Sequence, residues 1–305
     1  MFLKRFMCVF LVLVLLLFSA CTGDAPEAQN GSITVAASFY PVYIFTLNLV
    51  NGIEEINVEC MAEQTVGCLH DYSLTAKDAR LLSDAEILVI NGAGMESFLE
   101  DAFESVENLK VVDSSENIEV ICNVDHHEEE HNHTHHHENS HIWLSVNNAK
   151  LQVENIKNGL VAEFPEYEEN IEGNYEDYIA RLDALIEKRN MAIMGEKKAT
   201  AISFHGAFEY LAADLGFGIA ETIESSEGAE PSAKELAHLV SEIKEKNIKI
   251  LLIEPDYSGS AAGILSRETD AEIYTLNPMI SGDITLTAYE DIMEENYNSI
   301  LRVVE

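Results

Sequence analysis

Histidine is concentrated in one internal stretch of this sequence. Residues 125–141, DHHEEEHNHTHHHENSH, hold eight of the chain's eleven histidines, mixed with glutamate, asparagine and threonine. Expression tags are usually terminal and uniform, and this stretch is neither. Imidazole and carboxylate groups bind divalent transition metals, so the composition indicates metal binding.

Four histidines lie in local sequence contexts that can be considered one by one. His238 falls in a predicted helix, on its solvated surface. His205 follows a strand-like run and precedes a helical pattern, and ligands of parallel sheets gather at strand carboxyl ends. His70 lies between a strand-like run and a helix, and His141 leads into Ile-Trp-Leu, where packing could fix it. Three fixed imidazoles suit tetrahedral zinc, although their wide spacing alone is a weak signal.

Strand-like and helical patterns alternate on both sides of the histidine tract. The strand-like runs are 33–36, 56–60, 87–90 and 109–112, then 199–204, 217–220, 248–253 and 272–276. The helical patterns are 43–50, 75–83 and 96–103, then 207–214, 233–246, 261–267 and 286–303. This alternation predicts an α/β fold of two similar lobes, each a parallel sheet flanked by helices.

One long helix is predicted between the two lobes. Pro165 suits a helix start, and apolar residues then recur at steps of three and four through residues 166–189, about 36 Å of helix. We therefore predict an N-terminal lobe over 32–150 with a histidine-rich loop at 125–140, a linking region over 151–196, and a C-terminal lobe over 197–305. A cleft between the lobes is the expected ligand site.

The first residues are predicted to direct export. Lys4 and Arg5 precede thirteen apolar residues, a run too short for an ordinary membrane span, and residues 1–20 are typical of a signal peptide. Cys21 follows Ser-Ala, which resembles a bacterial lipobox, so we expect lipid on its thiol and a polar tether over 21–31. The expected location is outside the cytoplasm, anchored to the cell membrane.

Charge and cysteine content narrow the possible partners. The chain has 18 basic and 54 acidic residues, a net charge of −36, which argues against nucleic-acid binding.

Apart from Cys8 and Cys21, three cysteines remain, and the pair nearest in sequence is Cys60 and Cys68. An oxidising compartment permits a disulfide between them without requiring one. We expect a monomer.

Five segments together resemble one family. They are VGCLHDYSLTAKDARLLSDAEILVINGAGMESFL, HIWLSVNNAK, SFHGAFEYLAADLGF, EPSAKELAHLVSEIKEKNIKILLIEP and TLNPM. In order, from about Ile33 to the C-terminus, they resemble the zinc-type, cluster A-I solute-binding lipoproteins of bacterial ABC transporters. The resemblance implies two lobes bridged by a rigid helix, with a metal buried in the cleft and held by His70, His141 and His205. It also implies a protein that captures Zn2+, delivers it to a membrane permease and catalyses no reaction.

The fourth metal position is less defined. Asn277 stands where manganese-type members of the family have an aspartate, and a neutral amide suits a hard cation poorly, which favours zinc. Water, Glu63 or Asn277 could fill the position. Cys68-Leu69 also departs from the family, where proline often precedes the first ligand.

The remaining tract histidines are expected to bind zinc loosely, for capture or buffering, because ordering a mobile loop costs entropy. They are His126, His127, His131, His133, His135, His136 and His137. Three other functions remain open from the sequence: a manganese or iron(II) carrier with the same scaffold, a surface adhesion protein with the same scaffold, and a zinc hydrolase. The hydrolase is disfavoured because no HExxH motif or evident general base accompanies the proposed ligands.

Overall fold

The computed structural model describes residues 33–62, 72–99, 109–124, 136–193, 199–223, 230–257 and 259–301. The predicted signal peptide and the tether with Cys21 lie outside the described residues. Residues 33–305 form one compact unit. In the described part of the chain, no helix combines the length and apolar character that crossing a bilayer requires.

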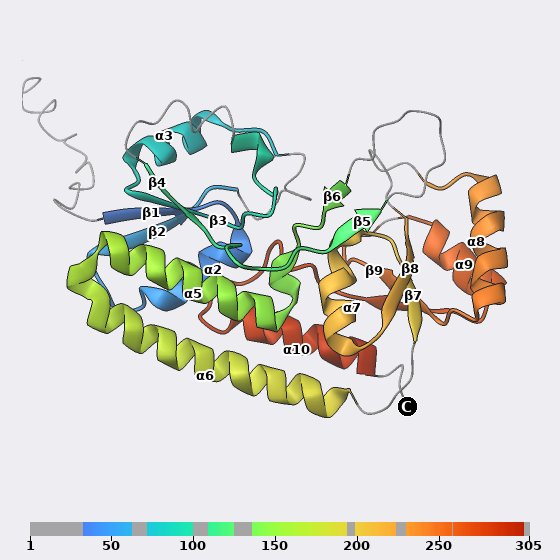
Figure 1. The fold of residues 1–305 in the computed structure, drawn as a ribbon. Helices are drawn as coiled ribbons and strands as arrows, with labels where there is room; N and C mark the ends of the chain where they lie inside the picture. The colour runs from blue at the N-terminus through green and yellow to red at the C-terminus, as the bar shows by residue number, and fades with distance from the viewer. Residues whose placement is uncertain are drawn as a thin grey trace, which may run out of the picture. The chain divides into compact units, whose positions relative to one another are not determined.

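The first sheet is parallel and four-stranded. It comprises β1 (Ile33–Ala37), β2 (Ile56–Cys60), β3 (Ile87–Ile90) and β4 (Lys110–Asp113), in the order β2-β1-β3-β4. Val35 in the central strand β1 pairs with Val58 and with Ile87, and all three are buried. Helix α2 (Tyr40–Leu49) packs on this sheet, and α3 (Ala76–Asp84) contacts β1 (Figure 1).

The second sheet repeats this arrangement. Its strands are β7 (Thr200–Ser203), β8 (Gly218–Thr222), β9 (Ile250–Ile253) and β10 (Glu272–Thr275), all parallel in the order β10-β9-β7-β8. Read from its other edge, this is the strand order of the first sheet. Helices α7 (Glu209–Leu215), α8 (Ala233–Lys246) and α9 (Ala261–Glu268) accompany it. The predicted fold class is confirmed.

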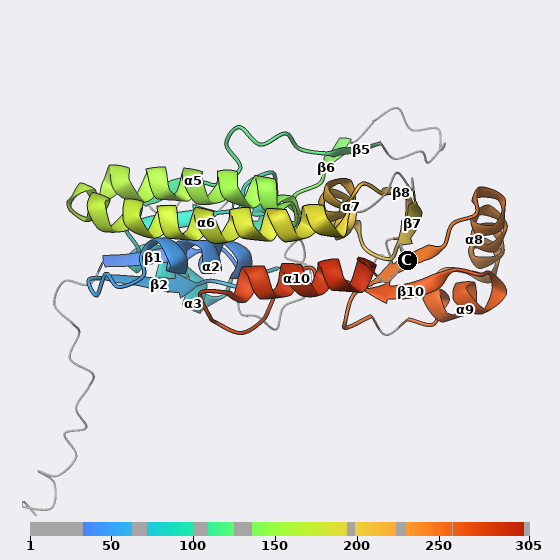
Figure 2. The same ribbon diagram turned by 90° about the horizontal axis from the view of Figure 1, so that it is seen from below.

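Three further helices run alongside one another. Helix α5 (Val146–Glu163) leads through a short 3-10 turn into α6 (Glu168–Ala192), and α10 (Ala288–Leu301) packs against α6 (Figures 1 and 2). With 25 residues, α6 is about 37 Å long. The apolar stripe predicted for it is buried at Ile171, Tyr178, Leu182 and Leu185. The long helix is therefore confirmed.

One apolar core connects both sheets to these helices. The same cluster contains Val35 of β1, Leu182 of α6, Ala201 of β7 and Met293 of α10. Trp143, just before α5, has no exposed surface and belongs to this cluster. Burial of apolar surface from all these elements therefore fixes the segment that contains His141.

The structure differs from the sequence-based expectation in two places and describes a third only in part. Helix α5 was not predicted, and the boundary expected after residue 150 falls inside it. Of the helix predicted over 96–103, the structure describes only residues 96–99, where Ser97–Leu99 form a 3-10 turn, and residues 100–103 lie outside the described residues. Within the loop predicted over 125–140, His136–Glu138 form β6, which pairs antiparallel with β5 (Cys122–Val124).

Candidate metal centre

Two of the three predicted ligands lie side by side. His141 lies between β6 and the short 3-10 helix Ile142–Leu144, and His205 lies between β7 and the 3-10 helix Gly206–Phe208. The two residues are 64 positions apart, yet their ring centroids are 5.1 Å apart and the rings are nearly perpendicular, at 86°. The fold thus brings together two imidazoles that the sequence keeps far apart.

This separation suits two ligands of one tetrahedral ion. A Zn–N bond of about 2.0 Å places the centroid of a bound imidazole about 3.2 Å from the metal, so two such rings have centroids about 5 Å apart. The observed 5.1 Å matches that value. The rings are therefore spaced so that one ion can contact both.

The side chain of Asn139 orients the ring of His141. Asn139 Oδ1 accepts the backbone N–H of His141 at 3.0 Å and lies 2.9 Å from His141 Nδ1. Asn139 Nδ2 donates to the carbonyl of Gly206 at 2.7 Å, which fixes which end of the amide is oxygen. The oxygen can only accept, so Nδ1 of the neutral imidazole carries the proton and Nε2 carries the lone pair that can bind a metal.

Glu254 has the same role beside His205. Its carboxylate accepts a hydrogen bond from Nδ1–H of the neutral His205 imidazole, an arrangement that again places the metal-binding lone pair on Nε2. His205 and Glu254 follow β7 and β9, which are neighbours and lie where the strand order reverses. Ligands of doubly wound sheets bind at this position. A carboxylate on the outer nitrogen also makes the imidazole a stronger metal ligand.

The surroundings of His141 exclude water. Only 6% of its surface is exposed, and the ring centroid of Trp143 lies 5.1 Å from that of His141. Trp143 packs edge-on against Phe39 and donates its indole N–H to the carbonyl of Pro278 at 2.9 Å. A ring held this firmly loses little conformational freedom when it binds a metal.

Several predicted site residues lie outside the described part of the chain. They are Glu63, Cys68, His70, His126, His127, His131, His133 and His135. His136 and His137 are in β6. Within the described ranges, no group of three or more metal-binding side chains is close enough to hold an ion. His238 is exposed on α8, as predicted.

Asn277 supports a turn next to this site. Its Oδ1 accepts the backbone N–H of Met279 at 2.8 Å, and Met279 has a left-handed backbone with φ of 58°. An asparagine side chain that bonds two residues ahead stabilises such a turn. The same turn presents the carbonyl of Pro278 to Trp143. The identity of the fourth ligand remains a prediction.

Cys60 has a free thiol. It donates to the carbonyl of Ala62 at 3.3 Å, and burial raises the pKa of the thiol to about 12. A thiol with so high a pKa is a poor nucleophile and a poor metal ligand.

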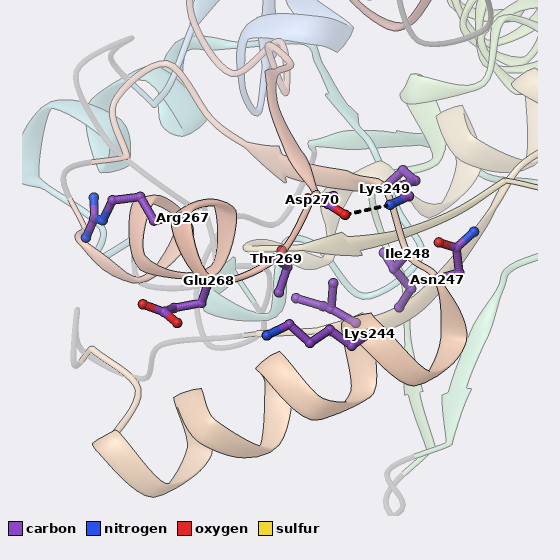
Figure 3. Close-up of a pocket in the computed structure, with 9 residues that line it drawn as sticks. Lys244, Asn247, Ile248, Lys249, Arg267, Glu268, Thr269 and Asp270 are labelled. Atoms are coloured by element: carbon purple, nitrogen blue, oxygen red, sulfur yellow. Dashed lines mark ion pairs between the residues drawn. The ribbon is translucent and has the colours of Figure 1, made fainter.

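A cavity elsewhere in the second lobe does not have the properties of a ligand site. The pocket of 230 Å³ in Figure 3 lies where α8 and α9 end, so it is at the opposite end of β9 from Glu254. The charged ends of Lys244, Lys249 and Arg267 lie at separate places and do not meet at one point, and Lys249 pairs with Asp270 at 3.8 Å. Carbonyl ends of helices also repel anions, so the basic residues there do not form an anion site.

Comparison with known proteins identifies the family. The family model described as "Zinc-uptake complex component A periplasmic" matches residues 35–303. The chain belongs to this family. The match covers both sheets, the long helix and all three predicted histidine ligands.

The similarity of the chain to individual members of this zinc-uptake family supports the match to the family model. The chain is 32% identical to the "High-affinity zinc uptake system protein ZnuA" of Bacillus subtilis, over 93% of each chain. It is 29% identical to the "Zinc-binding lipoprotein AdcA" of Streptococcus pneumoniae over 92% of this chain, but it spans only 56% of that relative, about half its length. The solved Zn(II)-bound ZnuA-like domain of that AdcA has a TM-score of 0.74 at 27% identity, covering 89% of this chain and 98% of the domain.

Sequence reasoning missed the two residues that orient the histidine rings. Glu254 directly follows an apolar strand, at the same kind of strand end that drew attention to His205. Asn139 lies two residues before His141. Both positions carried a signal, namely a polar side chain at a strand end or beside a predicted ligand. Their pairing with particular rings depends on tertiary structure.

Proposed function

We propose that this protein captures Zn2+ outside the cytoplasm and delivers it to an ABC permease in the membrane. The observation that carries the proposal is the approach of His141 and His205, each with an oxygen acceptor on Nδ1. That arrangement leaves the lone pair of each neutral ring on Nε2, in two rings whose spacing allows one ion to contact both. Membership of the zinc-uptake family and the names of its relatives support zinc as the ion.

His70 is the proposed third ligand. Neutral nitrogen ligands favour zinc over manganese, and water, Glu63 or Asn277 would complete the tetrahedron. The seven other histidines of the tract would collect zinc loosely and raise its concentration nearby. In this proposal the three fixed histidine rings bind one zinc ion tightly, and the tract binds a variable number of zinc ions weakly.

The proposed role involves no covalent chemistry. Zinc is the cargo, so the protein would bind it, present it to the permease and return empty. Lipid on Cys21 would keep a monomer at the membrane surface, within reach of that permease. This chain spans only 56% of the relative from Streptococcus pneumoniae, so the role rests on the family and on the residues themselves.

A calorimetric titration with zinc and with manganese tests the proposal. The wild-type protein is expected to bind one zinc tightly, to bind further zinc weakly, and to prefer zinc to manganese. His141→Ala and His205→Ala should each abolish the tight site, whereas His238→Ala, an exposed histidine of the second lobe, should retain it. A tight site that survives both ligand substitutions, or a preference for manganese, would refute the proposal.

A further inference from the structure

Asn139 makes more hydrogen bonds around the site than a residue that merely connects two elements would need. Besides its two contacts with His141, its Nδ2 donates to the carbonyl of Gly206 at 2.7 Å and to Glu209 Oε2 at 3.0 Å. Its own carbonyl accepts the hydroxyl of Tyr210 at 2.7 Å. Asn139 is 6% exposed, so these hydrogen bonds are shielded from water. One amide therefore contacts His141 and also the residue that follows His205.

The same segment is held from the first lobe as well. Asn91 follows β3, and its Nδ2 donates to the carbonyl of Ser140 at 2.9 Å. Gln152 of α5 donates to Asn91 Oδ1 at 3.0 Å, which fixes the orientation of the Asn91 amide. Residues 139–141 thus lie between Asn91 in the first lobe and Gly206 in the second, with hydrogen bonds to both.

We propose that Asn139 is a positioning residue that sets the tautomer of His141 and ties it to the segment carrying His205. This inference rests on the proposed zinc site and adds to it a residue that touches no metal. The amide has two separate tasks. Its oxygen selects Nε2 as the metal-binding nitrogen of His141, and its nitrogen fixes the distance between the two ligand segments.

Only an amide can perform both tasks at this position. The acceptor must face an N–H group of His141, and the donor must face a carbonyl oxygen and a carboxylate oxygen. An aspartate would keep the acceptor but would place negative charge against Gly206 O and Glu209, which is repulsive. An alanine at this position would supply neither the acceptor for His141 nor the donor for Gly206. Comparing the two substitutions therefore separates the effect on the His141 tautomer from the effect on the hydrogen bonds to Gly206 and Glu209.

Nitrogen NMR of the zinc-free, full-length protein tests the first task directly. At about pH 8, where free imidazole is neutral, the couplings of ring protons to the two nitrogens report the tautomer. The His141 signals are assigned by their loss in His141→Gln. We expect the Nδ1–H tautomer in the wild type and in Asn139→Asp, and a mixture of tautomers in Asn139→Ala. A pure Nδ1–H tautomer in Asn139→Ala would overturn this part of the proposal.

Zinc affinity, measured by competition with a chromophoric chelator, tests the second task. Asn139→Ala should bind zinc about 10–100-fold more weakly, as expected when a group that orients a ligand is removed. Asn139→Asp should lose less affinity, because its carboxylate keeps the acceptor on His141 Nδ1 while it repels the carbonyl of Gly206 and the carboxylate of Glu209. Tyr210→Phe is the matched control, because it removes a hydrogen bond to the Asn139 carbonyl and leaves the amide intact. Unchanged affinity in Asn139→Ala, or an equal loss in Tyr210→Phe, would show that Asn139 merely supports the backbone.

These results are separable from the proposed function. Absence of tight zinc binding by the wild-type protein would refute the transport role. The tautomer measurement needs no metal, so it would still decide whether Asn139 orients the ring of His141. Circular dichroism of each variant checks that it folds, and Asn139→Asp conserves size and shape should Asn139→Ala unfold.

Discussion

Two carboxylates occupy related places in the two sheets and perform different tasks. Glu254 follows β9 and pairs with His205. In the first sheet, Glu96 accepts the backbone N–H groups of Asn91 and Gly92, which follow β3, and the hydroxyl of Ser38, which follows β1. Glu96 therefore fixes the strand ends that hold Asn91, and through Asn91 it supports the backbone of Ser140.

Burial raises the pKa of Glu96 to about 7, despite the hydrogen bonds that lower it. A raised pKa means that the folded protein holds this proton more tightly than the unfolded chain does. The contribution of Glu96 to stability is thus fully present below about pH 4.3, falls as the pH rises toward 7, and is constant above that value. A tenfold difference in proton affinity between the folded and unfolded states corresponds to about 1.4 kcal/mol of stability.

The Glu96→Gln variant tests this dependence. Urea unfolding of zinc-free protein is measured from pH 4.5 to 8 for the variant and the wild type. The free energy of unfolding of the wild type, relative to Glu96→Gln, should decline between about pH 4.5 and 7 and then level off. Glu119→Gln, an exposed control, should give a flat difference. A flat difference for Glu96→Gln as well would show that the carboxylate is ionised throughout.

Residue type and local setting drew attention to His141 and His205, because each is a histidine beside a strand or a strongly packed segment, and the family resemblance then implied that they are metal ligands. The orientation of their rings was not predictable. It depends on Asn139, on Glu254 and on backbone carbonyls such as Gly206, whose approach is decided by tertiary packing. His70 was singled out on the same grounds, and its place in the site stays a prediction.

At the scale of elements, the end of the long helix is anchored by a buried ion pair. Arg189, in the last turn of α6, pairs with Asp214 of α7 at 2.7 Å, and their side chains are only 9% and 12% exposed. Asp214 also accepts the hydroxyl of Ser145, the residue that caps α5. One carboxylate therefore connects α5, α6 and α7.

Asp214→Ala should destabilise the protein by about 3–5 kcal/mol, because it leaves the Arg189 charge buried without its partner. The neighbouring pair of Lys188 with Glu294 is largely exposed, at 55% and 37% of each side chain. Lys188→Ala should therefore change stability by less than about 1 kcal/mol. Urea denaturation of the zinc-free variants provides the comparison, and equal losses in both would contradict this account of α6.

Elements with strong local signals were predicted closely, and α5 shows the limit. Strands β2 and β3 and helix α8 have the predicted bounds, and α8 begins with the predicted capping box at Ser232 and Glu235. Helix α5 has a clear signal too, since buried apolar residues recur every three or four positions from Val146 to Leu160. It was missed because the change of pattern after the histidine tract was attributed to the long helix alone.

At the scale of the whole molecule, two sheets with one strand order explain why distant residues converge. In each sheet the first strand lies between the second and third, so the strand order reverses between β1 and β3 and between β7 and β9. Asn91 follows β3 and Glu254 follows β9, and both support histidines of the site. The alternation in the sequence predicted the sheets. The alternation could not predict which strand ends would lie on the two sides of residues 139–141.

The central claim is that His70, His141 and His205 bind one zinc ion together. Anomalous X-ray diffraction at the zinc absorption edge, from crystals of the full chain loaded with one equivalent of zinc, tests it most directly. The account predicts one dominant peak, with a ring nitrogen of each of the three histidines at about 2.0–2.1 Å from it. A dominant peak bound only by histidines of the 125–138 tract, or one that leaves any of the three rings unbound, would contradict it.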